Sequence, residues 1–248
     1  MYYAVLSGDL IKSSKISDGE ERELLTTKLK ECLREVTNVF ELSRGDFYQA
    51  VIENCENSIW SAVYIRCFLK TILKPGITVK KVSENQRRSK ITSASNRSVF
   101  VDKNGIIVKN GTLGIDSRVA IGIGSINYKA KKIAESDGTA YHNSGRLFDD
   151  LKKGQNLTIK TNLDEENDKS LNLICMYLDH IISGWTFHQA EVILDLLRSE
   201  ENGLKQSELA EKYGISQPSL NQRIHAANWG LLKKSIDLSR EIIHKENI

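Results

Sequence analysis

The chain has 248 residues, of which 40% are hydrophobic and 27% are charged. That length exceeds the roughly 100–150 residues of a typical single domain, and the apolar content is sufficient for a packed core. The composition therefore excludes a wholly disordered protein. The net charge of +3 does not by itself mark a nucleic-acid binder. We expect a globular protein of two domains, in which any nucleic-acid contact is made by a local motif.

The cysteines and the apolar runs limit the cellular environment. The four cysteines are far apart and form no CxxC pair, which argues against a zinc site and against a disulfide framework. No run approaches the ~20 apolar residues that span a bilayer, and the opening MYYAVLSGDL has no basic segment before its short apolar run. We expect a cytoplasmic protein with reduced thiols and no membrane contact.

The first part of the chain alternates between strand and helix patterns. Residues 2–6 are a β-prone run that we expect to end in the turn Ser7-Gly8-Asp9. Further along, residues 17–40 have helical spacing, 43–46 fit a hairpin turn, and 59–73 fit a core helix that ends at Lys74-Pro75-Gly76. The remaining segments are listed in order: strand 117–126, helix 139–151 and strand 157–159. The predicted order is β-α-β-β-α-β-α-β, an α/β (α+β) domain over residues 1–163.

One segment of this domain, residues 77–112, is clearly basic. It contains eight lysines and arginines against Glu84 and Asp102. It is either a patch that contacts phosphate or nucleic acid, or a solvated insertion with a hairpin around Lys103-Asn104-Gly105, and charge runs more often simply face water.

An acidic segment separates this domain from the C-terminal part of the chain. We expect residues 162–169, NLDEENDK, to be a loop, followed by a connector helix over Leu171–Ser183. The connector is assigned to residues 164–184, and an all-α domain to residues 185–248.

The C-terminal part has the pattern of a helix-turn-helix. A first helix over 188–198 is followed by a short helix from Lys205, a glycine at Gly214, an apolar residue at Ile215, and the capping residue Ser216. Pro218 then lies early in the next helix, where its missing N–H costs least. Leu220 and Ile224 are expected to face inward, and the polar residues expected to contact DNA are Ser216, Gln217, Ser219, Asn221, Gln222 and Arg223.

The segment QSELAEKYGISQPSLNQRIHAANW resembles the helix-turn-helix of sigma-factor region four and of LuxR-type and MarR-type regulators. A helical bundle for dimerisation or protein docking is the alternative. That alternative gains weight because acidic residues slightly outnumber basic ones in this module, whereas a strong nonspecific DNA binder is more cationic.

Two carboxylates of the first domain are candidates for a cation site. Asp9 follows the first strand and Asp46 lies at the hairpin tip, so both are expected at one edge of the sheet. Paired carboxylates are the usual protein ligands of a Mg²⁺ or Mn²⁺ ion that also holds substrate phosphates. The alternative is that each aspartate caps a helix or forms a turn, and spacing alone favours this alternative.

The motif series VLSGDLIKSS, RGDFYQAV, RVAIGIGSI and SDGTAYHNSGRLFDDL resembles the ferredoxin-like palm domain of class III nucleotidyl cyclases and GGDEF proteins. The strongest overall resemblance is to the SatD family, with such a palm and often a C-terminal helix-turn-helix. The resemblance to cyclases implies that Asp9 and Asp46 are metal ligands. It also implies that nucleotide phosphates are contacted by Ser13, Ser14, Gly45 and Arg146.

The sequence departs from the cyclase pattern at the ribose and the base. Cyclases carry an asparagine four residues before the arginine that corresponds to Arg146, whereas this chain has His142 there and Asn143 one place later. No lysine and aspartate pair for base selection is evident. These departures favour a palm that binds a nucleotide as a signal over one that converts it.

Three functions follow as hypotheses. The first is a homodimeric DNA-binding regulator with a degenerate, nucleotide-sensing palm, since one small reading helix seldom suffices alone. The second is a metal-dependent nucleotidyl cyclase or nucleotidyltransferase that uses Asp9 and Asp46. The third is a non-catalytic adaptor that contacts other proteins.

Overall fold

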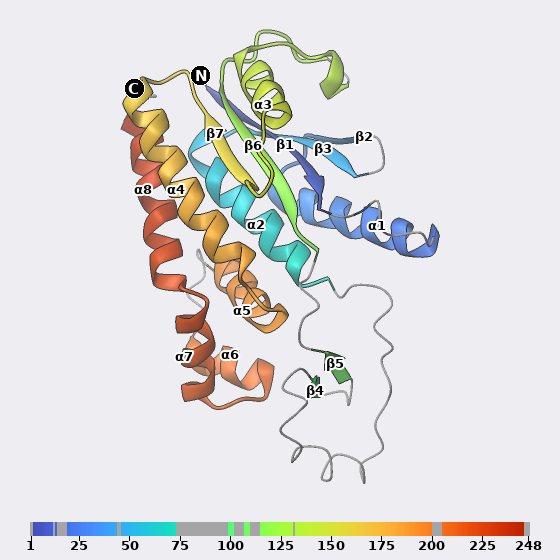
Figure 1. Cartoon of the computed structure of the whole chain (residues 1–248), viewed down its shortest axis with the longest axis vertical. Helices are drawn as coiled ribbons and strands as arrows, with labels where there is room; N and C mark the ends of the chain where they lie inside the picture. The colour runs from blue at the N-terminus through green and yellow to red at the C-terminus, as the bar shows by residue number, and fades with distance from the viewer. Residues whose placement is uncertain are drawn as a thin grey trace.

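The structure is a computed structural model of the whole chain (Figure 1). It describes residues 2–11, 13, 19–43, 46–72, 99–101, 107–109, 115–130, 132–199 and 205–245. These residues form a mixed α/β protein with one five-stranded sheet, as the sequence predicts, and a small two-stranded sheet. None of the described helices is both long enough and apolar enough to cross a membrane.

The five-stranded sheet has the order β2-β3-β1-β6-β7. Each neighbouring pair is antiparallel except β6 and β7, which are parallel. The strands are β1 (Tyr3–Leu10), β2 (Phe40–Ser43), β3 (Phe47–Ile52), β6 (Ser117–Gly124) and β7 (Leu157–Lys160). The strand order along the chain, with the helices between the strands, confirms the predicted β-α-β-β-α-β-α-β succession.

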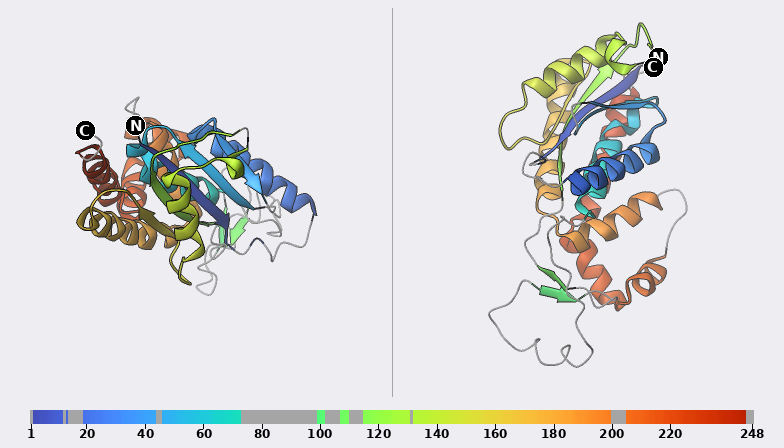
Figure 2. Two further views of the ribbon diagram at one scale, coloured as in Figure 1. Left: turned by 90° about the horizontal axis from the view of Figure 1, so that it is seen from above. Right: turned by 90° about the vertical axis from the view of Figure 1, so that its right-hand side faces the viewer.

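Helices cover both faces of this sheet. Helices α1 (Gly19–Val36) and α2 (Ser58–Lys70) lie on one face, and α3 (Thr139–Asp149) lies on the other (Figure 2). Strand β1 alternates accordingly: Leu6 belongs to the large core shared with α1 and α2, whereas Val5 packs with Ala140 of α3. Short 3-10 turns, η2 (Cys55–Asn57) and η4 (Ile133–Glu135), precede α2 and α3. The sheet is therefore buried on both sides.

Strand β1 is longer than predicted, and the expected turn at Ser7-Gly8-Asp9 is wrong. Ser7 and Gly8 pair with strands on both sides, and Asp9 pairs with Arg118 of β6; Gly8, for example, lies opposite Tyr48 of β3 and Val119 of β6. A Cβ atom at Gly8 would come within 2.4 Å of the Tyr48 ring, so glycine lets the tyrosine pack over the strand. Pairing on both edges and this close contact override the turn propensity of the three residues.

Two helix boundaries also differ from the prediction. Helix α1 ends at Val36, and Phe40 belongs to β2 because its backbone pairs with Ala50 in the hairpin. Helix α4 (Glu165–Ser183) begins inside the segment 162–169 that was expected to be a loop. Asp164 caps α4 by accepting a hydrogen bond from the Asn167 N–H, and acidic side chains in the first turn favour the positive end of the helix dipole.

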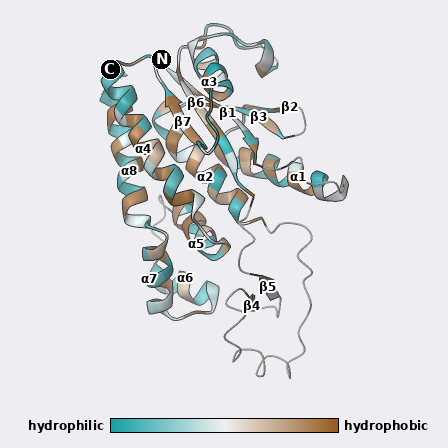
Figure 3. Cartoon of the chain, in the orientation of Figure 1, coloured by the Kyte–Doolittle hydropathy of each residue, from teal (hydrophilic) through white to brown (hydrophobic). Residues whose placement is uncertain are grey.

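The C-terminal part is helical. It contains α4 and then α5 (Phe187–Arg198), α6 (Gln206–Tyr213), α7 (Gln217–Ala226) and α8 (Trp229–Lys245), the last of which the sequence pattern did not predict. Polar and apolar residues alternate along α4, α5 and α8 (Figure 3), as amphipathic helices require. The apolar faces of these three helices belong to the same core as the sheet, which contains Leu178, Ile193 and Ile236. The proposed domains thus share one continuous core.

The described parts of the basic segment are two short strands. Strands β4 (Val99–Val101) and β5 (Ile107–Lys109) pair antiparallel, with Val101 opposite Ile107. This pairing fits the predicted hairpin. Its turn, and most of residues 77–112, lie outside the described residues.

The structure is held together by a buried arginine, Arg66 of α2. Its side chain has no exposed surface, and its Nε and Nη2 atoms donate to the Asp116 carboxylate at 2.8 and 2.9 Å. Its Nη1 atom donates to Asp179 of α4 at 2.8 Å. Lys70, one turn further along α2, adds a second cation to Asp116 at 3.1 Å. Two helices and the residue that directly precedes β6 therefore meet at one guanidinium.

Burial by itself raises the pKa of the Asp116 carboxyl, but attraction and hydrogen bonding to Arg66 outweigh it, so the net pKa lies below the ordinary value. Asp179 also accepts hydrogen bonds from the backbone and side-chain nitrogens of Asn156, at 2.8 and 3.1 Å. These bonds extend the network to the loop that enters β7. Every member is hydrogen-bonded, which is the condition under which buried charges are tolerated.

Arg66→Leu should therefore lower the free energy of unfolding by about 3–5 kcal/mol, because two buried carboxylates lose their partner. The matched control is Lys28→Ala, which breaks only the half-exposed pair with Glu31 on α1 and should cost about 0.5 kcal/mol or less. Urea denaturation followed by circular dichroism measures both. A loss of less than about 1 kcal/mol for Arg66→Leu would contradict the central role of this network.

Candidate functional site

Asp9 and Asp46 lie at the same end of the sheet. Asp9 is the penultimate residue of β1, and Asp46 directly precedes β3. Because β1 and β3 are antiparallel, with Gly8 opposite Tyr48, the end of one strand meets the start of the other. Ser13, in the segment after β1, donates a short hydrogen bond from its Oγ to Asp46 Oδ2. The structure thus brings Ser13 and Asp46 together, near the end of β1 that carries Asp9.

A third charged residue, Arg118 of β6, occupies this end of the sheet. Its Nε donates to Asp9 Oδ1 at 2.9 Å, and its Nη2 donates to Asp9 Oδ2 in a second, shorter contact. The guanidinium also lies 5.3 Å from the centre of the Phe148 ring. The hydrogen bond to Asp9 and the charges of Asp9 and Asp46 raise the pKa of Arg118 above its ordinary value, against a lowering by burial.

The Asp9 and Asp46 pair does not fit a divalent cation in this arrangement. Magnesium and manganese need direct carboxylate oxygens at about 2.1 Å, and both oxygens of Asp9 are taken by Arg118. Within the part of the chain that the structure describes, no group of three or more histidine, cysteine, aspartate or glutamate side chains is arranged to hold a metal. We therefore assign no step to a metal at this site.

The other predicted nucleotide contacts are not gathered around Asp9. Arg146 is exposed on α3, two residues beyond the buried Ser144, and at about 100° per residue this places it on the opposite side of the helix from the sheet. Its side chain forms no ion pair with Asp9 or Asp46, each of which the structure describes. Ser14 and Gly45 lie outside the described residues.

His142 and Asn143, at the ribose position of cyclases, have internal partners. His142 Nε2 lies 2.8 Å from Asp137, and Asn143 Nδ2 donates to the Ile123 carbonyl and to Asn162 Oδ1 at 3.0 Å each. The Asn143 amide therefore connects α3 to the end of β6 and to the segment after β7.

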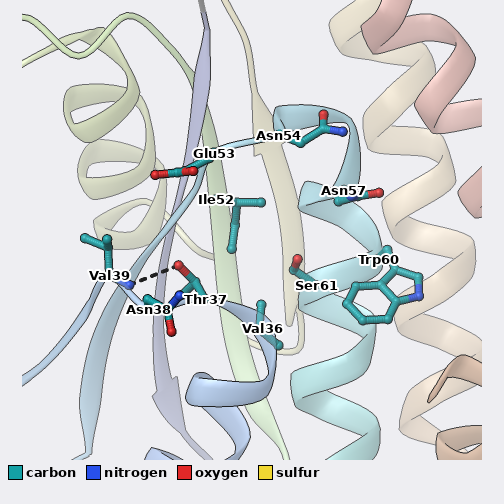
Figure 4. A pocket seen from close by; sticks show the side chains of 10 residues that line it. All are labelled: Val36, Thr37, Asn38, Val39, Ile52, Glu53, Asn54, Asn57, Trp60 and Ser61. Atoms are coloured by element: carbon teal, nitrogen blue, oxygen red, sulfur yellow. Dashed lines mark hydrogen bonds between the residues drawn. The ribbon is translucent and has the colours of Figure 1, made fainter.

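Two cavities lie near the start of β2, and none of the predicted site residues lines them. One of about 300 Å³ is formed between the ends of α1, β3 and the first turn of α2, and Figure 4 shows Asn38, Asn54, Trp60 and Ser61 around it. The other, of about 540 Å³, shares Asn38 and extends towards Lys129 and Tyr141. Both have mixed polar and apolar walls.

The second candidate site is formed by α5, α6 and α7. Val192, Leu209, Ala210, Leu220 and Ile224 form a small core between these helices. The inward orientation predicted for Leu220 and Ile224 is confirmed, since they are 0% and 8% exposed. Asp195 of α5 holds α6 in place by accepting from Lys212 Nζ and Tyr213 Oη, each at 2.6 Å. The orientation of α6 against α5 is therefore fixed by both apolar and charged contacts.

The turn between α6 and α7 has the predicted local structure. Gly214 ends α6 in the left-handed conformation with φ +61°, and the Ile215 N–H returns to the Ala210 carbonyl at 3.0 Å, the bond that closes a Schellman turn. Ser216 then caps α7 by accepting from the Ser219 N–H, and a proline follows in the first turn. The hydroxyl of Ser216 is thus used within the protein.

The residues predicted to contact DNA lie together on α7 and its cap. Gln217, Ser219, Asn221 and Gln222 are exposed, and Arg223 is half-buried on the same helix. The first turn of α7 contains no acidic residue. The positive end of its helix dipole is therefore not neutralised from within the helix.

The model of the SatD family matches residues 73–239. This chain belongs to the SatD family. The matched range contains Arg118, α3 and all of α5, α6 and α7, but not Asp9 or Asp46. Comparison with curated proteins and with solved structures finds no match to the chain.

Two residues that matter at these sites were missed in the sequence of this SatD family member. Arg118 begins the otherwise apolar run RVAIGIG, and Asp195 lies in the apolar helix VILDLL. A charged residue inside an apolar element is a signal that it has a buried or half-buried partner. The identity of that partner follows only from the strand pairing and the helix packing.

Gly214→Ala should destabilise the protein by about 1–2 kcal/mol, because a side chain raises the energy of the left-handed conformation. No atom lies within 4 Å of the added Cβ, so a steric clash does not contribute. The matched control is Gly230→Ala in α8, which also has open space and should be neutral or stabilising by up to about 1 kcal/mol. Thermal denaturation measures both variants. Equal stabilisation by the two substitutions would contradict the left-handed conformation of Gly214.

Proposed function

We propose that this SatD family protein is a DNA-binding regulator in which α6 and α7 form a helix-turn-helix. The observation that carries the proposal is the α6–α7 pair: a left-handed glycine turn, a serine cap, a buried apolar side and an exposed polar side on α7. Helices α6 and α7 lie at the end of the molecule away from the sheet (Figure 1). Recognition helices contact base edges through the side chains of their first turns, and in α7 these are the predicted residues.

The charge of the module indicates which kind of DNA binding to expect. Residues 185–248 contain nine acidic and eight basic side chains, and Arg198 and Lys212 are paired with Glu35 and Asp195. Such a module lacks the excess positive charge that drives nonspecific binding. We propose sequence-dependent contacts by α7 and a homodimer that supplies two recognition helices to one site.

The N-terminal sheet supports a palm-like sensor as the second part of this proposal. Strands β2, β3, β1 and β6, with α1 and α2 on one face, follow the order of the ferredoxin-like β-α-β-β-α-β unit on which nucleotidyl cyclase palms are built. We propose that residues 1–163 bind a nucleotide as a signal and that residues 164–184 connect them to the module. The paired state of Asp9 favours sensing over catalysis.

Direct contacts connect the proposed sensor to the module. Cys67 of α2 lies 3.2 Å from the Ala190 carbonyl of α5, and Arg198 at the end of α5 donates to Glu35 and to the Tyr64 hydroxyl. Trp185 Nε1 donates to the Ala227 carbonyl at the end of α7 at 3.0 Å. A change in the position of α1 or α2 would be transmitted to α5 and α7 through these bonds.

The DNA-binding part is tested with a duplex that the wild-type protein selects from a random-sequence pool. Gln217→Ala combined with Arg223→Ala should weaken binding at least about tenfold, because two base or phosphate contacts are removed. Arg34→Ala, which removes an exposed arginine of α1, should leave the affinity unchanged. Fluorescence anisotropy gives the affinity, and the end point of a stoichiometric titration should correspond to two chains per duplex. Equal binding by the double variant and the wild type would contradict the assignment of α7.

If residues 1–163 are a sensor, they should bind a nucleotide without converting it. With ATP or GTP and Mg²⁺ or Mn²⁺, the purified protein should release no pyrophosphate, and one of these nucleotides should change the DNA affinity by about 5- to 150-fold. Pyrophosphate release that Asp46→Asn abolishes would support the cyclase or nucleotidyltransferase alternative instead. Absence of both DNA binding and nucleotide binding would leave the adaptor alternative.

A further inference from the structure

We propose that Arg118 replaces a divalent cation at Asp9 and Asp46, so that this end of the sheet works without metal. The proposal concerns the sheet domain and does not depend on DNA binding. It begins from an observation about charge: the acidic pair that resembles a metal site already has a cation. The Arg118 guanidinium contacts both Asp9 oxygens, and Asp46 directly precedes β3, the strand that pairs with β1 on its other edge.

The position of Arg118 is fixed by the backbone. Arg118 is the direct cross-strand partner of Asp9 in the β1–β6 pair, so the two side chains project from the same face of the sheet, about 5 Å apart at their Cβ atoms. Next to them, the Ser117 hydroxyl donates to the Asp9 carbonyl at 2.7 Å and contacts the buried Tyr48 hydroxyl at 2.9 Å. The strand register therefore holds the arginine at this carboxylate.

The Arg118 guanidinium also contacts an aromatic ring, which packs against a second ring. Phe148 of α3 lies beneath Arg118, and Phe47 packs edge-on against Phe148 with their ring centres 5.2 Å apart. A planar guanidinium can form a bidentate carboxylate pair and contact a ring face at the same time, which a lysine ammonium does less well. An arginine at position 118 can therefore pair with Asp9 and contact Phe148 at the same time.

Arg118 and a metal ion exclude each other at this site. A divalent ion would need the Asp9 oxygens that Arg118 occupies, and the guanidinium would repel it at close range. Asp46 alone, with one oxygen accepting from Ser13, is a single carboxylate and a weak ligand set. A phosphate-bearing ligand that enters here would therefore meet the arginine as its cation.

The experiment is a Mn²⁺ titration, followed by the electron paramagnetic resonance signal of free Mn²⁺. The wild-type protein should leave the signal of millimolar Mn²⁺ almost unchanged. Arg118→Met, which keeps the apolar contact with Phe148 and removes the charge, should bind Mn²⁺ at least about tenfold more tightly. Adding Asp9→Asn to that variant should abolish the gain.

Control variants separate the effect of removing the charge from the effects of added space and of misfolding. Arg118→Lys keeps the positive charge and should not gain Mn²⁺ binding, and Arg34→Met, which removes an exposed arginine of α1, should have no effect. Circular dichroism establishes that each variant is folded, and Arg118→Gln replaces Arg118→Met if the latter is not. Wild-type Mn²⁺ binding that Asp9→Asn removes would overturn the proposal, as would the absence of any gain in the folded charge-removing variant. Neither DNA nor nucleotide is present, so failure here is distinct from failure of the proposed function.

Discussion

The buried guanidinium of Arg66 is the interaction on which the rest of the structure depends. It is fully inaccessible to water and binds Asp116, at the entrance to β6, and Asp179, in the middle of α4. Removing such charges from water costs several kcal/mol per ion, which is offset only if almost every donor and acceptor is satisfied. Here Asn156 and Ser183 complete the set. The geometry of four elements, α2, α4, β6 and β7, is therefore specified at one point.

The same end of β6 also carries the arginine of the candidate site, because Asp116, Ser117 and Arg118 are consecutive residues. Strand β6 begins with the core residue Ser117, and the next residue, Arg118, is placed against Asp9 by the pairing that Asp116 initiates. The Arg66–Asp116 and Arg118–Asp9 ion pairs therefore lie two residues apart at one end of β6. In the proposed function, this edge of the sheet binds a charged ligand through Arg118 and does not carry two-metal chemistry.

The helices connect the two candidate sites. Helix α2 carries Arg66, which binds Asp179 of α4. The same helix contacts α5 through the Cys67 thiol and through the hydrogen bond of Arg198 to the Tyr64 hydroxyl. Helix α5 in turn packs against α6 and α7 in the small core that contains Val192. A proposed signal at the sheet therefore has a continuous packed path to the proposed recognition helix α7.

The sequence by itself determined the succession of strands and helices in the five-stranded sheet domain, the hairpin, and the local structure around Gly214 and Ser216, because these depend on hydrophobic period and on side chains that bond to their own backbone. It also indicated the SatD family. Only the tertiary structure decided that Ser7-Gly8-Asp9 continues a strand, since that depends on two neighbouring strands and on Tyr48 over Gly8. Likewise, only the packed sheet shows that Asp9 is paired with Arg118. The two residues are more than a hundred positions apart, and no local pattern specifies a contact that strand register creates.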